Sequence, residues 1–414
     1  MKAGRLTLTA AGDCLLGRRV SEVQDPGFLA LVELLRGSDC AWGNCEVVLT
    51  DPAAVYRVPK INDPHAGCAP WGADELSFMG FGLMGTANNH TMDFGVKGLG
   101  STLANLDRVG IVHAGAGLDL AQAARPAYRD TAAGRVALVN CASSFLDYYA
   151  AGPPEPVHKG RPGLNPIHFQ YVVQVERPLF ESLRQAQAKI HDLLGWDEYA
   201  DTLARMEAAR PAGTGLFFET VIQAGEEVEL FSQPRPADVA RVLTAIQAAR
   251  QEARVVIASI HSHEARRRLE EPDPFLPPFA RDCLDAGADV FLAAGPHVAR
   301  GIEMYRGKPI FYSLGNFCAH FKVQGSAPAG GLLGQRRFWE SFVPRVTFAE
   351  EGGIAEIELH PITLGFDEPV TARGTPRLAR GEEARLILER LAGLSRLYGT
   401  SVEIDGEIGR VRVA

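Results

Sequence analysis

Short apolar runs alternate with amphipathic stretches along most of the chain. The apolar runs are rich in aliphatic residues and are followed by glycine and polar residues, which is typical of buried strands. They cover residues 6–13, 42–50, 135–144, 254–264 and 289–298. Stretches with helical spacing of apolar residues lie between them, at 28–37, 98–110, 236–253 and 279–287. This alternation predicts an α/β protein.

The section from 147 to 235 has a different character. It begins with a run rich in proline and glycine, 148–166, and continues into a polar helical stretch, 176–206, with a break expected at Gly195. We interpret 147–235 as an insertion or lid between two halves of one fold, 1–146 and 236–414. The second half ends with a hairpin-like segment, a β-like segment and a helix, at 302–317, 342–364 and 381–399.

Composition narrows the classes of partner. The chain has 414 residues, a formal net charge of −8 and no block of Lys or Arg, which argues against nucleic acid or an anionic membrane as the main partner. Seven cysteines without a CxxC pair are expected to be reduced. The first residues lack the apolar core of a signal peptide, and no run of about eighteen apolar residues is present. We therefore expect a cytoplasmic protein without a membrane anchor, acting on a small polar ligand.

Polar clusters follow five of the predicted strands. Because the carboxyl ends of strands in α/β folds meet at one edge, these clusters are expected to form one site. Asp, Asn and His are ligands for zinc, manganese or iron, and they are also common acid and base groups. The clusters are Asp13; Asn44 with Glu46; Asn88, Asn89, His90 and Asp93; His261, His263 and Glu264; and His297.

Each cluster taken alone also has a structural interpretation. Asp13 is placed to cap a helix, and Asn88 and Asn89 to form turns. His261 and His263 would point to opposite faces of a continuing strand, so that one faces the site and the other is structural. The shared position of all five clusters favours the functional interpretation.

Several segments together resemble the CapA/PgsA family, named for poly-γ-glutamate capsule biosynthesis and belonging to the calcineurin-like metallophosphatase superfamily. The resemblance covers roughly 1–145 and 250–320. Its segments are TAAGDCLLGR, GNCEVVLT, ANNHTMDFGVKGLGSTLANLDRVGIVHAGAG, IHSHE and GADVFLAAGPHVARGIEMYRGKPIFYSLGNF. The resemblance implies an αββα sandwich of two mixed sheets, flanked by helices, with the site at the strand ends.

The resemblance also implies roles for individual residues. Asp13 matches a first-motif ligand, Asn44 or Glu46 the second motif, and Asn89 a ligand beside His90 as general acid. His261 and His297 match later motifs. Glu46 and Asn89 are also expected to contact substrate. Arg18, Arg300 and Glu303 follow the motifs closely and are expected to hold substrate carboxylates or to orient the histidines.

The chain departs from the superfamily pattern at two histidines. Cys14 and Leu15 follow Asp13, where the pattern has Asp-x-His, and Gly295 precedes Pro296 and His297, where most CapA-like sequences keep a histidine. The two-metal ligand set is therefore incomplete, which predicts no metal or one divalent metal such as Mn, Zn or Mg. Its tentative ligands are Asp13, Glu46, Asn89, His261 and His297.

The main functional hypothesis is acid/base chemistry by Asp13 and His297, with His90 and His261 as further catalytic residues. The substrate is expected to be a peptide or a poly-glutamyl chain, and the reaction is expected to take place near one of its carboxylates. The reaction is either epimerisation at a peptide Cα, by similarity to lasso-peptide epimerases of the family, or amide hydrolysis.

The alternatives are a metal-dependent phosphoesterase or amidohydrolase, a poly-γ-glutamate biosynthesis accessory protein and a non-catalytic binding protein. The segment 147–235 is expected to cover the substrate, with Trp196, Tyr199, Phe217 and Phe218 in a peptide groove or in ordinary helical packing. The sequence does not set the oligomeric state.

Overall fold

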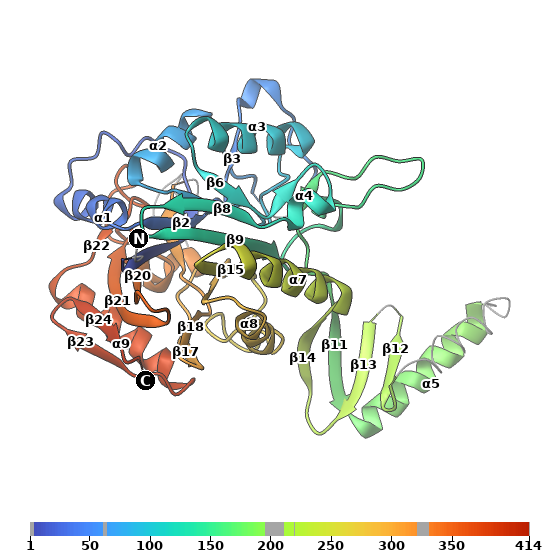
Figure 1. Ribbon diagram of the computed structural model, residues 1–414. Helices are drawn as coiled ribbons and strands as arrows, with labels where there is room; N and C mark the ends of the chain where they lie inside the picture. The colour runs from blue at the N-terminus through green and yellow to red at the C-terminus, as the bar shows by residue number, and fades with distance from the viewer. Residues whose placement is uncertain (1–3, 61–63, 195–210, 219, 321–330, 414) are drawn as a thin grey trace.

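Two mixed sheets form the body of the protein (Figure 1). The computed structural model describes residues 4–60, 64–194, 211–218, 220–320 and 331–413. The first sheet has the order β23 (Val402–Asp405), β24 (Ile408–Val411), β21 (Ile354–Thr363), β20 (Glu340–Phe348), β1 (Leu6–Leu15), β2 (Cys40–Asn44), β5 (Leu83–Gly85) and β6 (Val112–Ala114), with β19 (Asn316–Ala319) paired to β1 and β22 (Arg377–Leu378) paired to β21. The second has the order β17 (Ile302–Tyr305), β18 (Lys308–Phe311), β16 (Val290–Ala294), β15 (Val255–His261), β9 (Gly134–Ala142) and β8 (Ala127–Thr131).

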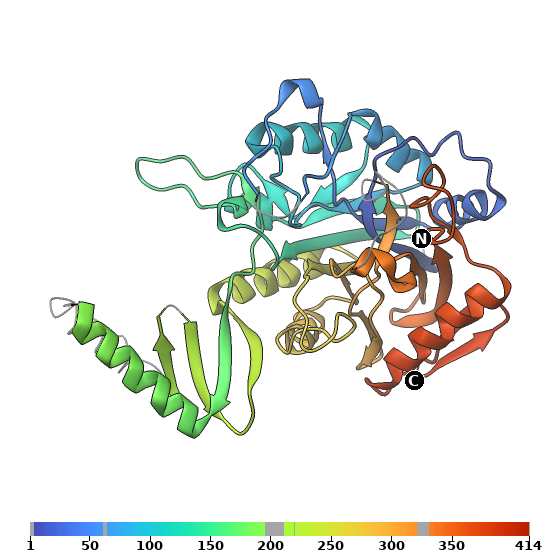
Figure 2. The same cartoon turned by 180° about the vertical axis from the view of Figure 1, so that it is seen from behind.

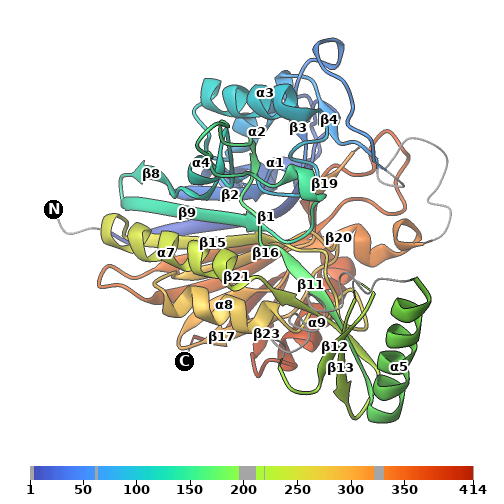
Figure 3. The same cartoon turned by 90° about the vertical axis from the view of Figure 1, so that its right-hand side faces the viewer.

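The largest hydrophobic core lies between the two sheets. Alternate residues of β1, Leu6, Leu8 and Ala10, pack there with residues of the second sheet such as Leu138 and Ile257. The outer face of the first sheet is covered by α1 (Pro26–Arg36), α2 (Trp71–Met79) and α3 (Gly95–Arg108), and that of the second sheet by α7 (Pro236–Glu252) and α8 (Leu276–Asp285) (Figure 3). The predicted αββα sandwich is confirmed.

Gly12 allows the carboxyl end of β1 to approach the turn before β19. A Cβ atom on Gly12 would lie 1.8 Å from the carbonyl oxygen of Gly315, so a residue with a side chain would force the two segments apart. The amide of Asp13 donates to that same oxygen at 2.9 Å. Asp13 is thereby fixed at the end of β1.

The insertion contains a separate sheet that extends away from the sandwich (Figures 1 and 2). Its strands, in spatial order, are β12 (Thr214–Phe217), β13 (Thr220–Gly225), β11 (Phe169–Glu176) and β14 (Glu229–Pro234). Helix α5 (Arg177–Leu194) packs on one face, where Phe180 meets Val175 and Ile222. The sequence predicted a helix here, and the four strands are a correction. The alternation in FQYVVQVE, at 169–176, is the signal for β11.

The remaining expectations for 147–235 have mixed outcomes. Phe217 packs in the small core under α5, and Phe218 is half-exposed. Gly195, Trp196 and Tyr199 lie outside the described residues. Residues before the small sheet lie against the sandwich, because the amide of Ala142 in β9 donates to the carbonyl of Asn165 at 3.1 Å. In the same stretch, β10 (Gly163–Leu164) pairs with β7 (Ala116–Gly117). The division at 147 stays a prediction.

The two chain segments that enter and leave the small sheet run side by side. The amide of Arg235 donates to the carbonyl of His168 at 2.7 Å. Asp238 of α7 accepts from the His168 amide at 3.0 Å, lies 2.7 Å from its Nδ1 and accepts from Arg241 at 2.6 Å. Burial alone would raise the pKa of Asp238, but the His168 and Arg241 contacts outweigh it and lower that pKa to about 2.

All seven cysteines are buried and carry free thiols, as expected from the sequence. Within the described residues we find no helix with the length and hydropathy needed to cross a bilayer.

His320, which follows β19, predicts a loss of stability in acid. Burial lowers its pKa from 6.5 to about 3, so between these values the unfolded chain binds a proton that the folded chain does not. The free energy of unfolding should therefore fall, through this group, by about 1.4 kcal/mol for each pH unit below 6.5. Urea unfolding at several pH values gives the slope of the free energy of unfolding against pH. This slope should be smaller by that amount in His320→Gln than in wild type. The exposed His158→Gln should keep the wild-type slope, and an equal slope in both variants would refute the prediction.

Candidate active site

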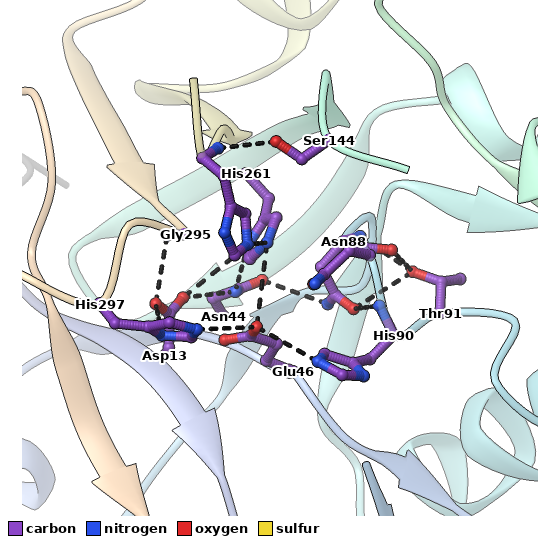
Figure 4. Close-up of polar contacts among 12 residues, drawn as sticks. Asp13, Asn44, Glu46, Asn88, His90, Thr91, Ser144, His261, Gly295 and His297 are labelled. Carbon is purple, nitrogen blue, oxygen red and sulfur yellow. Dashed lines mark hydrogen bonds and ion pairs between the residues drawn. The ribbon is translucent and has the colours of Figure 1, made fainter. Parts of the chain in front are cut away.

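The carboxyl ends of strands from both sheets meet in one buried cluster (Figure 4). Strand pairing places Asp13 of β1 beside Asn44 of β2 and Asn316 of β19. His261 ends β15, and His297 follows β16 in the neighbouring position. The structure thus brings together side chains that are far apart in the sequence, by the strand-end convergence expected above.

Asp13 is a fully buried carboxylate held by three donors. Asn44 Nδ2 donates to its Oδ1 at 2.7 Å, the Gly295 amide donates to its Oδ2 at 3.1 Å, and His297 Nδ1 lies 3.3 Å from Oδ2. Burial alone would raise the pKa of Asp13, but the contacts with His297, His261 and Asn44 outweigh it and hold that pKa below its ordinary value. Asp13 is therefore ionised at neutral pH.

His297 has its proton on Nδ1. Asn316 Nδ2 donates to the carbonyls of Phe338 and His297, at 3.0 and 3.3 Å, so the amide oxygen of Asn316 is the atom that faces the imidazole. That oxygen lies 2.9 Å from Nδ1, and an amide oxygen only accepts. Nε2 of His297 therefore carries the lone pair, and it lies 3.9 Å from Glu46 Oε1. The backbone φ of His297 is +61°, an uncommon conformation that fits a constrained functional residue.

His90 is oriented in the same way by a second carboxylate. Its Nδ1 lies 2.7 Å from Asp93 Oδ2, which leaves the lone pair on Nε2, 3.8 Å from Glu46 Oε1. Asp93 also receives Lys60 Nζ at 2.5 Å and the Tyr149 hydroxyl at 3.0 Å. Burial alone would raise the pKa of Asp93, but His90 and Lys60 lower it below its ordinary value. Figure 4 shows Glu46 between the imidazoles of His90 and His297.

His261 and His263 are in direct contact, with 2.9 Å between their Nε2 atoms. His261 Nε2 lies 3.9 Å from Glu46 Oε1, and burial lowers the pKa of His261 to about 3. The expectation that one of the two faces away from the site is wrong. The strand β15 ends at His261, so its alternation does not extend to His263.

Comparison with known proteins identifies the family. Residues 7–320 match the model of the bacterial capsule synthesis protein PGA_cap, which is about three quarters of the chain. The chain belongs to the PGA_cap family. The resemblance stated from the sequence is confirmed, and its metallophosphatase-like fold agrees with the sandwich.

Several known proteins are similar to this PGA_cap chain. The uncharacterized protein y4sH of Sinorhizobium fredii is 35% identical over 444 residues, covering 98% of this chain and 93% of the relative. The PGA biosynthesis protein CapA of Bacillus subtilis is 25% identical, over 75% of this chain and 63% of its own length. A probable polyglutamine synthesis accessory protein of Mycobacterium tuberculosis is 26% identical, over 67% of this chain and 54% of its own length. The similarity to lasso-peptide epimerases stays a prediction.

Three residues expected to bind substrate have structural partners in this PGA_cap chain. Arg18 donates to the carbonyls of Val370 and Thr371. The buried Arg300 donates to the carbonyls of Leu269 and Glu264, at 2.7 and 2.9 Å. Glu303 accepts from Arg281 at 2.8 Å and from Tyr312 at 2.5 Å. These contacts fix loops and a helix, and a role toward substrate stays a prediction for all three.

The adjacent asparagines of the ANNH motif differ in their surroundings. Asn88 Nδ2 donates to the Cys45 carbonyl at 2.9 Å, and its Oδ1 accepts from the His90 amide at 3.1 Å. Asn89 accepts from Lys60 through its carbonyl at 3.1 Å, whereas its buried Oδ1 receives no hydrogen bond from a described residue. That oxygen is suited to the ligand role expected for Asn89, which stays a prediction.

Sequence reasoning missed Lys60 and Asn316 as parts of the cluster. Lys60 lies in a Pro-rich loop without a motif, and Asn316 lies in a predicted strand segment. His263 was named among the polar residues after a strand, but the alternation argument admitted only one of the two histidines to the site.

The donor set suits one divalent cation of the kind that the fold of the PGA_cap family implies. Asp13, Glu46 and His297, all buried, offer three ligand atoms within 4.8 Å of one another, and so do Glu46, His261 and the half-buried His263. In the first group the lone pair of His297 is on Nε2, and carboxylate oxygens with one imidazole nitrogen suit zinc or manganese. Asp13, Glu46 and His297 are therefore the residues that would hold such an ion.

Proposed function

We propose that this chain acts on a peptide or poly-γ-glutamyl substrate by acid/base chemistry, with His297 as the base and Asp13 as the group that orients it. The observation that carries the proposal is the contact of 3.3 Å between Asp13 Oδ2 and His297 Nδ1, which leaves the lone pair on Nε2. An ionised carboxylate at Nδ1 stabilises the imidazolium that forms when Nε2 takes a proton.

Membership of the PGA_cap family supports the class of substrate. The names of two relatives refer to the synthesis of PGA or polyglutamine by those proteins. A chain of glutamyl residues has a carboxylate near every amide and every Cα–H bond. We therefore place this protein in the synthesis or modification of such a polymer, or of a peptide with the same groups.

Two reactions are compatible with the arrangement of the bases. In epimerisation, His297 Nε2 takes the proton from Cα, and a second group returns a proton to the opposite face of the same carbon. In amide hydrolysis, Nε2 takes a proton from the attacking water, and the leaving amine receives one. His90 would be the second group in both cases, because Asp93 orients it at Nδ1 and its Nε2 also faces Glu46. Since its neutral ring has the lone pair on Nε2, His90 first takes up a proton from solvent there, and the resulting Nε2–H is the proton that it gives to Cα or to the leaving amine.

A second candidate function is metal-dependent hydrolysis of a phosphoester or an amide. The observation that favours it is the convergence of Asp13, Glu46 and His297. A divalent metal held there would supply Lewis acidity at the substrate's carbonyl or phosphoryl oxygen. In this function Asp13 and His297 hold the ion rather than move protons.

One experiment tests both functions. The metal-depleted full chain is incubated in D₂O with α-linked and γ-linked glutamyl peptides and with an apolar peptide, and the products are analysed by mass spectrometry. Deuterium at Cα without cleavage supports epimerisation, and new amino termini support hydrolysis by acid/base chemistry. Turnover that requires added Mn²⁺ or Zn²⁺ supports the second candidate and refutes the first. No turnover with or without metal refutes both for these substrates.

A further inference from the structure

We infer that Arg266 and Arg267 form a subsite for the carboxylates of a glutamyl chain beside the candidate active site, and that Glu227 and Glu229 of the small sheet occupy this subsite in the free protein. The class of substrate rests on the proposed function. The subsite itself rests on the position and contacts of the loop 264–272, which continues directly from His263.

The loop carries the longest run of basic residues in the chain, Arg266–Arg268, and all three residues are exposed. The run begins three residues after His263, which is at most about 11 Å along extended backbone. A protein with a net charge of −8 repels a polyanion at long range, so a polyanion binds where positive charge is concentrated. This run concentrates positive charge next to the candidate site.

The loop is held in place at both ends. The buried Arg300 donates to the carbonyls of Glu264 and Leu269, at 2.9 and 2.7 Å. At the other end, Asp273 accepts from the amide of Ser232 in β14 at 3.2 Å and from its hydroxyl at 2.9 Å. The backbone that carries the arginines is therefore fixed between the sandwich and the small sheet.

Two of the three arginines pair with glutamates of the small sheet. Arg266 donates to Glu229 at the start of β14, and Arg267 Nη2 lies 3.5 Å from Glu227 Oε1 in the turn before that strand. The side chains of Arg267 and Glu227 are 61% and 63% exposed. Water screens ion pairs at such exposure, so they add little to stability and another carboxylate can replace the glutamate.

The two ion pairs have the chemistry expected of bound substrate. A glutamyl polymer presents one carboxylate per residue, and Glu227 and Glu229 present two carboxylates on a stretch of three residues. The planar guanidinium binds either kind of carboxylate through parallel N–H donors. Glu227 and Glu229 therefore compete with the substrate for the same two arginines.

A polymer has an advantage in this competition. When one of its residues lies at the cluster of Asp13 and His297, its neighbouring residues are held near the loop at a high effective concentration. Binding of these neighbours at Arg266 and Arg267 then strengthens binding of the whole chain. The subsite accordingly favours long polycarboxylates over single amino acids and neutral peptides.

Fluorescence anisotropy of the full chain with a fluorescein-labelled γ-linked glutamyl oligomer tests the subsite. We expect Arg266→Gln/Arg267→Gln to weaken binding by about tenfold, since each exposed charge pair contributes about threefold. The control is Arg135→Gln, at the amino end of β9. Arg135 is 41% exposed, against 42% for Arg266, and it also pairs with a carboxylate, Asp130. It should keep wild-type affinity, and equal weakening by both variants would overturn the inference.

The competing glutamates provide a second test, in the opposite direction. Glu227→Gln/Glu229→Gln should tighten binding of the oligomer by about threefold or more, because it removes the internal competitors. Glu176→Gln/Glu226→Gln removes the same charge from two other exposed positions of the small sheet and its turn, and should change affinity less than twofold. Equal tightening in the two double variants would mean that only net charge matters, which would overturn the inference.

The choice of ligand separates carboxylates from other partners. An α-linked glutamyl oligomer shows which linkage binds more tightly, and arginine-dependent binding of either one supports the subsite. Equal binding of a neutral glutamine oligomer, or of an oligonucleotide with the same charge, would overturn it. Turnover of glutamyl peptides together with unchanged affinity in Arg266→Gln/Arg267→Gln would refute the subsite and leave the proposed function intact. Arginine-dependent binding without turnover would support the subsite and refute the proposed reaction for that polymer.

Discussion

Turnover of the active substrate should fall by about 10²–10⁴-fold when His297 is replaced with glutamine, the range that a general base contributes. Glutamine keeps a polar side chain of similar length but cannot take a proton at Nε2. Because Asn316 and Asp13 both contact Nδ1, the rest of the cluster can retain its hydrogen bonds to the new amide. Initial rates at saturating substrate, compared with wild type, measure the effect.

The matched control for this experiment is His113→Gln. His113 also contacts a carboxylate, Asp107 at 3.1 Å, but lies on β6, away from the cluster. It should keep wild-type turnover. Asp13→Asn should lose activity as well, and the double variant should be little worse than His297→Gln because the two residues act as one unit. Turnover by His297→Gln within about threefold of wild type would mean that His297 does not move the proton.

Asp93→Asn should lower the free energy of unfolding by about 3–5 kcal/mol, the cost of removing one partner from a buried ion pair. Asp93 Oδ1 lies 2.5 Å from Lys60 Nζ, and the two side chains are 0% and 1% exposed. The variant removes the carboxylate charge that faces the buried ammonium of Lys60. It also replaces the acceptor that holds His90. Urea unfolding at pH 7 measures the loss.

Two further variants distinguish the buried charge from a general loss of packing. Lys60→Met in the Asp93→Asn background removes the buried ammonium and should restore most of the stability. Asp74→Asn breaks an ion pair with Arg108 at 2.8 Å in which both side chains are about half exposed, and should cost less than about 1 kcal/mol. If Asp93→Asn lowers the free energy of unfolding by no more than Asp74→Asn does, the buried ion pair between Lys60 and Asp93 does not stabilise the fold as expected.

The sandwich could be predicted from the sequence because its strands and helices carry strong local patterns. The stretches 136–139 and 255–258 are continuously apolar since both faces of β9 and β15 are covered. The expected helix at 236–253 agrees with α7 within a residue at each end. The strands of the small sheet were missed because Gln and Glu interrupt their apolar positions, and α5 beside them gave the stronger signal.

The residues of the candidate site that lie at strand ends could be predicted from the sequence. Asp13, His261 and His297 share that position, and fold topology brings such positions together. Partners that come from elsewhere were not predictable. Lys60 reaches Asp93 from a loop, and Asn316 is placed beside Asp13 by strand pairing between β1 and β19, which no local pattern encodes.

The contact between His168 and Arg235 makes the segment between them a unit that can be removed or exchanged. Since the chain leaves and re-enters the sandwich at points joined by one hydrogen bond of 2.7 Å, the stretch 169–234 is topologically a side branch. Removing it and joining its ends through a short turn breaks no strand of the two large sheets. Such a branch can be exchanged as a unit, because a different version can join the same sandwich, and one insertion or deletion can add or remove it.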